Sequence, residues 1–368
     1  MNFSVSSSAF LKQLQVASGA LSSNPVMAIL EDFLLELKGK LLTITTSNLE
    51  VTIQTSLEVQ GKGNGKIAIS GKTLLETLKS LPEQPVSFEI NDETRGVEIT
   101  SSSGKYKLVG ENPADFPELT KPDTEDSIEI EAKSLLAAID RTIFATSNDE
   151  MRQAMKGVCM NIDFNHITFV ATDAHKLVKS AFLDVTSETA ASLILTKKTL
   201  LTLKGIVRAD SKVKIYFNKT KAYFEFDNVM VTARLIEGKF PDYNAVIPIN
   251  NPNKLRINRQ ELLSSIRRLS IFANKSTNQI VFDIQENSLT INAQDLDMNN
   301  EATEQLICNY DGEILDISLN AKYLIEILSV MVSEEIVFEI HSTNKPVIIV
   351  PAEQEPNEDL LLLVVTNY

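Results

Sequence analysis

Apolar residues along this chain follow two alternating spacings. Short stretches in which every second residue is apolar, typical of half-buried strands, lead into stretches with apolar residues at i, i+1 and i+4, typical of amphipathic helices. This strand-then-helix pattern begins at Phe3, Ile128 and Leu255. The helical positions that we expect to be buried are Phe10, Leu11 and Leu14, then Leu135, Leu136 and Ile139, then Leu262, Leu263 and Ile266.

Two further patterns recur three times in the same order. A strand, helix, turn and strand begin at Ile67, Leu193 and Leu315, and a pair of strands precedes each at Leu34, Val158 and Ile280. Successive copies of these patterns begin 122 to 127 residues apart. Chance does not account for a matched order in three copies. The sequence therefore predicts an α+β protein of three similar domains, each with two helices packed on antiparallel sheets.

The predicted domains are 1–120, 127–248 and 249–368. Their boundaries fall near a polar, acidic stretch at 118–127 and a stretch rich in proline and asparagine at 248–254. Such compositions favour linkers. Because the strand–helix–strand theme occurs twice in each copy, we also expect each domain to be internally pseudo-symmetric.

Composition places the chain among ordinary globular proteins, with 43% apolar and 23% charged residues. No stretch is long and apolar enough for a membrane span, and the N-terminus lacks the basic and apolar segments of a secretory signal. Cys159 and Cys308 are far apart and form no CxxC pair. We therefore expect a cytoplasmic protein with two reduced, buried thiols and no metal or cofactor.

The residues of catalytic sites are sparse. There are three histidines, and the chain has no P-loop, nucleophile elbow or dinucleotide fingerprint. The DLD at 295–297 offers two carboxylates, which in a loop are usually just solvated. The sequence therefore predicts a protein that is not an enzyme.

The net charge of −14 argues against a nucleic-acid binder that works by affinity. The six predicted helices, however, carry +10, which leaves −24 for the rest of the chain. One interpretation is that the helices line a surface for phosphates; the other is that helices tolerate lysine and arginine on solvated faces. The residues expected to face DNA are Lys12, Lys72, Lys79, Arg141, Lys197, Lys198, Lys204, Arg208, Arg267 and Arg268. Without tryptophan or a base-reading motif, such binding is weak, and retention on DNA has to be topological.

Several strings resemble those of the bacterial β sliding clamps, the β subunits of DNA polymerase III. The strongest are TDAHKL at 172–177 and FPDYNAVIP at 240–248, supported by ADFP at 114–117 and NPVMAILEDFLL at 24–35. The resemblance runs from the first residues to the last. It implies a head-to-tail homodimer whose six domains form a ring around double-stranded DNA, without sequence preference, and confer processivity on the replicative polymerase.

The resemblance also implies a pocket for short apolar peptides between the second and third domains. Its occupants would be the replicative polymerase, the clamp loader, and repair and other clamp-binding proteins. Carried over residue by residue, the pocket consists of Met155, Thr172, His175, Leu177, Pro241, Val246, Leu362 and Leu363. The last two stand where the family has a methionine–proline step.

The subunit contact implied by the resemblance pairs the first domain with the third domain of the partner. Tyr106 and Leu108 match the first side, and Ile271 and Phe272 match the second. The alternative reading is a repeat-built scaffold that binds protein partners and does not encircle DNA. Such a scaffold requires neither a dimer nor a basic inner surface.

Overall fold

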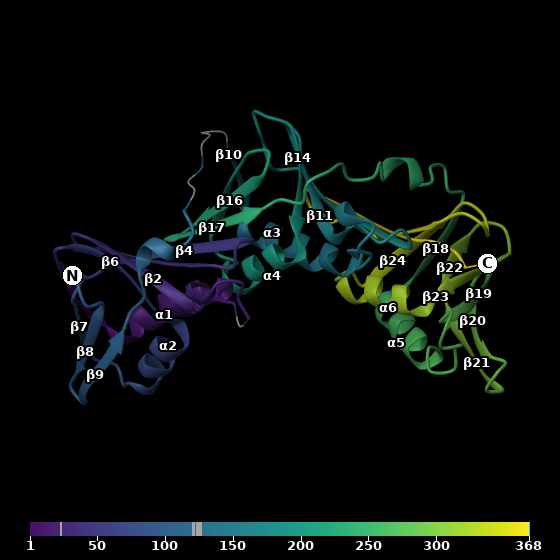
Figure 1. The fold of residues 1–368 in the computed structure, drawn as a ribbon. Coiled ribbons are helices and arrows are strands. Elements are labelled where there is room, and N and C mark those ends of the chain that lie inside the picture. The colour runs from purple at the N-terminus through teal and green to yellow at the C-terminus, as the bar shows by residue number, and fades with distance from the viewer. Residues whose placement is uncertain (23, 120–121, 123–126, 368) are drawn as a thin grey trace. The chain divides into compact units, whose positions relative to one another are not determined.

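The computed structural model describes residues 1–22, 24–119, 122 and 127–367. These residues form two compact units, one of 1–136 with 198–235 and one of 137–197 with 236–368. The described helices, labelled in Figure 1, are α1 Ser7–Ala17, α2 Gly71–Ser80, α3 Ala132–Thr142, α4 Lys197–Ile206, α5 Arg259–Leu269 and α6 Ala321–Val330. Short 3-10 turns are η1 Ser18–Ala20, η2 Ala28–Glu31, η3 Pro113–Asp115, η4 Ile143–Ala145, η5 Gln153–Lys156 and η6 Asn244–Val246.

The first unit holds two antiparallel sheets. The five-stranded sheet has the order β5-β1-β7-β8-β9, and the eight-stranded sheet has the order β10-β15-β16-β17-β4-β3-β2-β6. Their bounds are β1 Asn2–Ser6, β2 Asp32–Lys38, β3 Leu41–Ser47, β4 Val51–Glu58, β5 Gln60–Lys62, β6 Asn64–Ser70, β7 Pro85–Ile90, β8 Gly96–Ser101, β9 Gly104–Val109, β10 Ser127–Glu131, β15 Lys212–Phe217, β16 Lys221–Phe226 and β17 Val229–Arg234.

The second unit is built in the same way. Its nine-stranded sheet has the order β14-β11-β12-β13-β26-β25-β24-β18-β22, and its four-stranded sheet has the order β21-β20-β19-β23. Their bounds are β11 Gly157–Ile162, β12 Ile167–Thr172, β13 Lys176–Phe182, β14 Ala191–Thr196, β18 Asn253–Asn258, β19 Gln279–Gln285, β20 Ser288–Asp295, β21 Asn300–Ile307, β22 Asn309–Asp311, β23 Leu315–Asn320, β24 Glu335–Ile340, β25 Val347–Pro351 and β26 Glu358–Val364.

The order of elements repeats as the sequence predicts. A strand, a helix and three strands occur twice in the last third, as β18-α5-β19-β20-β21 and then β23-α6-β24-β25-β26. The first strand of each half pairs with a strand of the other half: β18 pairs with β24, and β23 pairs with β19. The first third does the same, with β1 on β7 and β6 on β2. The two halves of a repeat therefore complete each other's sheets, and the expected pseudo-symmetry is present.

Hydrogen bonds continue the sheets across the predicted domain boundaries. Val229 of β17 pairs with Thr55 of β4, and Lys176 of β13 pairs with Val364 of β26. Such pairing satisfies edge strands that would otherwise be open. The boundary between the two compact units accordingly runs through the central third of the chain. The division into domains at 1–120, 127–248 and 249–368 stays a prediction. Much of the predicted linker at 118–127, namely 120–121 and 123–126, lies outside the described residues.

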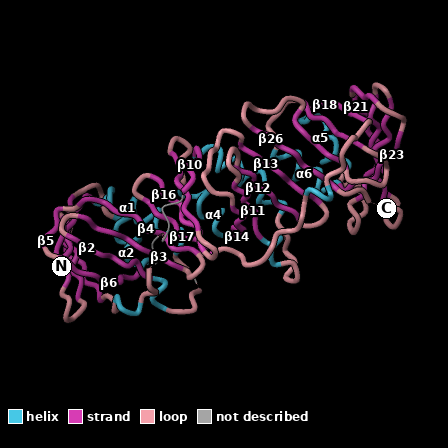
Figure 2. Tube along the Cα trace, turned by 90° about the horizontal axis from the view of Figure 1, so that it is seen from above, coloured by secondary structure: helices cyan, strands magenta, loops and turns pink. Residues whose placement is uncertain are grey.

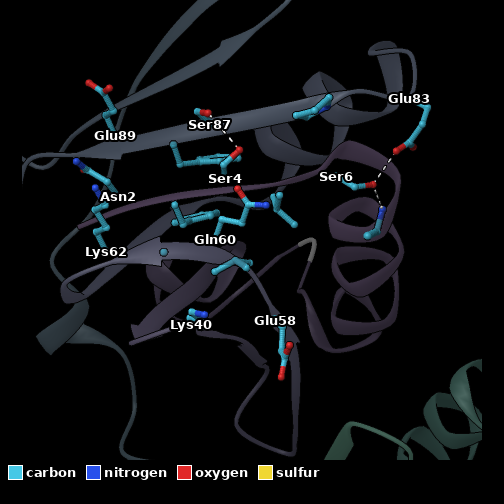
Figure 3. A pocket seen from close by; sticks show the side chains of 17 residues that line it. Asn2, Ser4, Ser6, Lys40, Glu58, Gln60, Lys62, Glu83, Ser87 and Glu89 are labelled. Atoms are coloured by element: carbon cyan, nitrogen blue, oxygen red, sulfur yellow. Dashed lines mark hydrogen bonds between the residues drawn. The ribbon is translucent and has the colours of Figure 1, made fainter.

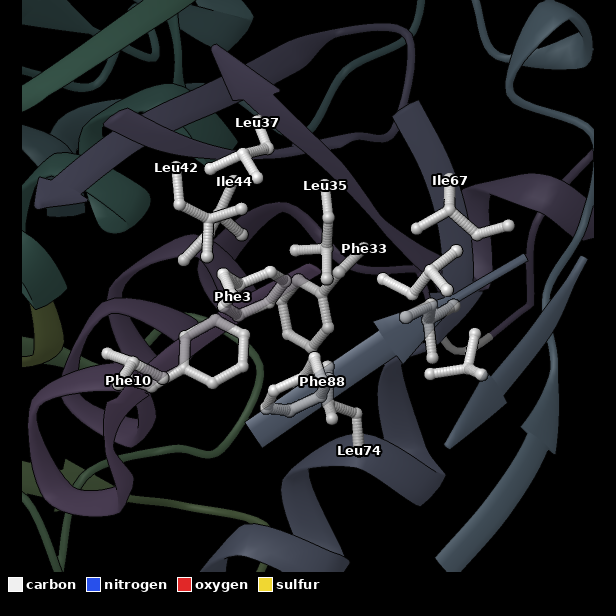
Figure 4. Packing of buried hydrophobic residues seen from close by; sticks show 14 of the residues in the cluster. Phe3, Phe10, Phe33, Leu35, Leu37, Leu42, Ile44, Ile67, Leu74 and Phe88 are labelled. Carbon is white, nitrogen blue, oxygen red and sulfur yellow. The ribbon is translucent and has the colours of Figure 1, made fainter. Parts of the chain in front are cut away.

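Helix α1 shows how the apolar pattern becomes a core. Ser6 caps the helix by accepting a hydrogen bond from the backbone N–H of Ala9 at 3.2 Å. Phe10 is fully buried, and its ring meets that of Phe88 edge-on with centroids 5.4 Å apart. Phe3 stacks on Phe88 at 4.7 Å (Figure 4). Leu74 and Leu78 of α2 belong to the same apolar core, which holds both helices against the strands of the first unit.

One pair of neighbouring helices lies in each unit. Figures 1 and 2 show α1 beside α2 in the first unit and α5 beside α6 in the second, with the strands (magenta in Figure 2) on their other side. Both cysteines are free and buried, as expected. Over the residues that the structure describes, no helix has the length and apolar character needed to cross a membrane.

Candidate functional site

The basic side chains of the predicted DNA-facing set lie mostly on solvent-facing sides of helices. In α1, Lys12 is exposed while Phe10 and Leu14 are completely buried. Nine of the ten predicted residues are exposed: Lys12, Lys72, Lys79, Lys197, Lys198, Lys204, Arg208, Arg267 and Arg268. One detail differs from the helices that we expected: Arg208 follows the end of α4.

Arg141 is the exception within this set. Its residue is only 8% exposed, and its guanidinium donates to Glu358 Oε2 at 2.6 Å and to Ser180 Oγ at 3.4 Å. A guanidinium that is itself buried and held by a carboxylate is not available to a phosphate. We therefore interpret Arg141 as a structural residue of the second unit. No local pattern in the sequence indicates this contact, because Glu358 lies 217 residues away.

The turn that contains TDAHKL is organised by its own side chains. Asp173 Oδ1 accepts hydrogen bonds from the backbone N–H groups of His175 and Lys176, both at 2.9 Å. Thr172 Oγ1 donates to the Lys176 carbonyl at 2.7 Å. Ala174 takes a left-handed backbone conformation with φ of 77°, which an alanine rarely adopts. These bonds reverse the chain between β12 and β13 and leave His175 exposed.

Strand register brings three predicted pocket residues side by side. Leu177 pairs with Thr172 on β12 and with Leu363 on β26. Both leucines are at most 3% exposed and belong to one apolar cluster with Cys159, Val170, Ile194 and Phe240. Because side chains alternate across a sheet, Leu362 points to the opposite face and lies outside this cluster. Leu361 and Val365, which the prediction did not name, pack against the cluster instead.

The FPDY loop lies over the same apolar cluster. Phe240 is buried within it, and Tyr243 and Ile247 pack against it. The Tyr243 hydroxyl accepts a hydrogen bond from Asn161 Nδ2 at 3.1 Å, which ties the loop to β11. Pro241 and Val246, the predicted pocket residues, are exposed on this loop. Met155 is buried in η5 but is not a member of the cluster.

The aromatic side chain of Tyr323, which the sequence did not indicate, lies against His175. The His175 imidazole stacks on Tyr323 of α6, with centroids 5.9 Å apart and planes inclined by 21°. The backbone N–H of Val365 donates to the His175 carbonyl at 2.9 Å, so the C-terminal strand is fastened to the same turn. Burial, with the nearby charge of Asp173, raises the pKa of Tyr323. Tyr323 carries no local signal, since any amphipathic helix has such a residue.

The predicted subunit-contact residues lie at edges. Tyr106 and Leu108 are half-buried on β9, an outer strand of the five-stranded sheet, where they pack on the core. Ile271 and Phe272 follow α5 and are 64% and 40% exposed. An exposed apolar patch that follows a helix end is the kind of surface that a partner covers.

A hollow of about 980 Å³ lies on the first unit, over β1, β5 and β7 (Figure 3). Its polar side chains bond to one another: Ser6 Oγ donates to Glu83 Oε1 at 2.7 Å, and Ser87 Oγ donates to Ser4 Oγ at 3.3 Å. The rim mixes lysines and glutamates. No part of the predicted peptide pocket lies in it.

Comparison with known proteins covers almost the whole chain. The family models for the DNA polymerase III beta subunit match at 1–120 (N-terminal domain), 129–242 (central domain) and 244–364 (C-terminal domain). The beta sliding clamp of Synechococcus elongatus is 28% identical over 350 residues, 92% of either chain. The beta subunit of Streptococcus pyogenes superposes with a TM-score of 0.94 at 23% identity over all of both chains. A Pseudomonas aeruginosa sliding clamp bound to griselimycin superposes at 0.92, with 24% identity over 100% of this chain and 99% of that one.

Proposed function

The chain belongs to the DNA polymerase III beta subunit family, and we propose from this premise how its surfaces work. It is a DNA sliding clamp, built of three clamp domains with two helices each. The observation that carries this conclusion is the succession of three family domains over the repeated strand and helix order. The expected fold class is thereby confirmed, and a repeat-built scaffold that never encircles DNA is not favoured.

The exposed basic residues of the helices are the proposed DNA-facing surface. Their charges are long-range and not arranged for reading bases, which suits a ring that slides along duplex of any sequence. The acidic remainder of the chain repels DNA from other surfaces. Retention on DNA then depends on closure of the ring around the duplex, not on affinity.

The partner-peptide pocket is proposed at the turn 172–177, the exposed loop residues Pro241 and Val246, and the apolar cluster of Leu177 and Leu363. A concave apolar surface with a few polar anchors suits a short extended peptide. The polymerase, the clamp loader and repair proteins would compete for it. Griselimycin, bound in the P. aeruginosa relative, is a second probe, and we expect it to displace such a peptide.

The dimer contact is proposed between β9 with Tyr106 and Leu108 on one subunit and the end of α5 on the other. Both β9 and β21 are outer strands of their sheets and can extend them across the seam. We propose that the protein acts in the cytoplasm as a tether on replicating DNA and has no catalytic role of its own.

The test of clamp function is retention on DNA of different topology. Labelled protein is loaded by its cognate loader onto nicked circular DNA, half of the sample is linearised, and gel filtration in moderate salt reports the protein that stays bound. We expect retention on circles and loss from linear molecules, since only a closed link holds the ring. Equal retention on both would mean affinity binding. Loss from both, with a loader that works on another clamp, would favour the scaffold.

A further inference from the structure

A buried ammonium group joins two parts of the second unit. The Lys176 side chain is 6% exposed, and its Nζ lies 2.7 Å from Asp173 Oδ2 and 3.1 Å from Glu326 Oε2. Asp173 belongs to the turn between β12 and β13, whereas Glu326 belongs to α6. A buried cation persists only where opposite charges compensate its lost hydration. The two carboxylates do so here, and the lysine thereby fastens the turn to the helix.

The same ammonium group lies over an aromatic ring. Lys176 Nζ is 4.5 Å from the centroid of Tyr323, within the range of a cation–π contact, and 6.0 Å from that of Phe144. Tyr323 in turn stacks on His175. A continuous set of contacts therefore runs from the carboxylates through Lys176 and Tyr323 to the exposed imidazole.

Lys176 is a fixed charge. Burial lowers the pKa of Lys176, but the hydrogen bonds and charges of Asp173 and Glu326 outweigh this, and the net shift is upward. The group stays protonated through the physiological range. Its positive charge is therefore present at neutral pH.

We propose that Lys176 is a positioning residue of the partner-peptide pocket: through Tyr323 it sets the orientation of His175 and the distance of the 172–177 turn from α6. This inference rests on the proposed peptide pocket. A lysine buried between two carboxylates presents no net positive charge to a ligand, so the residue acts on peptides through the rings. A pocket held open in this way binds without the cost of ordering its walls.

The test compares Lys176→Met, Lys176→Arg and Glu326→Gln with the wild-type protein. Lys254→Met serves as the control, because Lys254 pairs with Glu339 in the same sheet and touches neither ring. Fluorescence anisotropy with a labelled peptide from the C-terminus of the cognate polymerase gives affinity. The Hε1 proton of His175, one of only three histidines, reports the ring stack by NMR, since a proton over a ring face is shielded. His175→Ala with Pro241→Ala tests the pocket itself.

We expect Lys176→Met to weaken peptide binding about tenfold or more and to move the His175 signal towards that of an unstacked histidine. Glu326→Gln should do the same to a smaller extent, Lys176→Arg should recover most of the affinity, and Lys254→Met should change neither readout. If Lys176→Met unfolds, the milder Glu326→Gln decides. Wild-type affinity with an unmoved His175 signal in the Lys176 and Glu326 variants would overturn the inference. If the His175, Pro241 double variant also binds as the wild type does, the pocket assignment fails as well.

Discussion

Single buried charges show where this chain departs from a simple apolar interior. Arg141 and Lys176 are held by carboxylates, whereas Asp32 lies near two further acidic residues, Glu111 and Glu31. Asp32 is 7% exposed at the start of β2. Burial, then the charges of Glu111 and Glu31, raise its pKa from 3.8 to about 6. Such a group makes the folded state bind a proton more tightly than the unfolded state does.

Asp32 should therefore lower stability at neutral pH. Both states are protonated below about pH 4; as the pH rises towards 6, the unfolded state releases its proton first, so stability falls and the full penalty is present above pH 6. Two pKa units correspond to at most about 3 kcal/mol. We expect Asp32→Asn to raise the melting temperature at pH 7.5 and to match the wild type near pH 4. The exposed Asp316→Asn is the control, and an equal effect of both substitutions at pH 7.5 would contradict the assignment.

Helices are the elements in which sequence and structure agree most closely. Each begins after an alternating strand. The predicted i, i+1, i+4 residues of α1, α3 and α5 are all buried or half-buried, as with Leu262, Leu263 and Ile266 of α5. What the helices present to solvent is less uniform. Arg268 bonds twice to Glu304, at 2.7 and 2.6 Å, and Lys198 lies 3.9 Å from Glu50. The positive charge of these helices is thus partly neutralised by nearby glutamates of the same unit.

Helix α4 is the place to test the basic surface, because Lys197 and Lys198 begin it and are both exposed. Lys197→Ala with Lys198→Ala should weaken binding of the protein to short duplex DNA at low salt. The slope of log affinity against log salt should fall by about one to two, since each lost phosphate contact removes about one released counterion. Lys62→Ala with Lys66→Ala changes the net charge equally on strands β5 and β6. An equal loss in both pairs would mean that overall charge, not α4, governs binding.

At the scale of the whole molecule, the open edges of sheets and the exposed apolar residues have to be covered. Ile271 and Phe272 are exposed in the single chain, and β9 and β21 each leave one side unpaired within their sheets. Isolated proteins seldom leave such surfaces uncovered. We propose that a second copy of the chain covers both at once in the head-to-tail dimer that the family implies.

Ile271→Ala with Phe272→Ala should therefore produce monomers. Burying two such side chains contributes about 1.5–3 kcal/mol each, so their loss should raise the dimer dissociation constant by a hundredfold or more, at about 1.4 kcal/mol per tenfold. Sedimentation should then give 40.8 kDa in place of twice that mass. Phe164→Ala with Leu183→Ala, at 61% and 52% exposure, is the matched control. An unchanged dimer mass in the Ile271, Phe272 variant would refute the contact.

The candidate site was only partly predictable. TDAHKL and FPDYNAVIP indicated the turn and the loop through their resemblance to the family, and the hydrogen bonds of Thr172 and Asp173 that form the turn are local, within four residues. Of the two leucines predicted to line the pocket, Leu363 lies beside Leu177 and Leu362 lies on the opposite face, since a shift of one residue along a strand reverses the face. The pocket itself stays a prediction. Tyr323 and Glu326 could not be found, because no local pattern marks a helix residue that meets a turn about 150 positions earlier.

Apolar periodicity alone dictates the succession of strands and helices, the threefold repeat and the buried face of each helix, because these depend on spacing within a few residues. Local hydrogen bonding likewise dictates the turn at 172–177. Only the tertiary structure decides which strands pair, and hence that sheets run across the predicted domain boundaries. It alone also places Arg141 on Glu358 and Lys176 between Asp173 and Glu326. Contacts between residues far apart in the chain arise from packing and desolvation of whole elements, which no short stretch of sequence encodes.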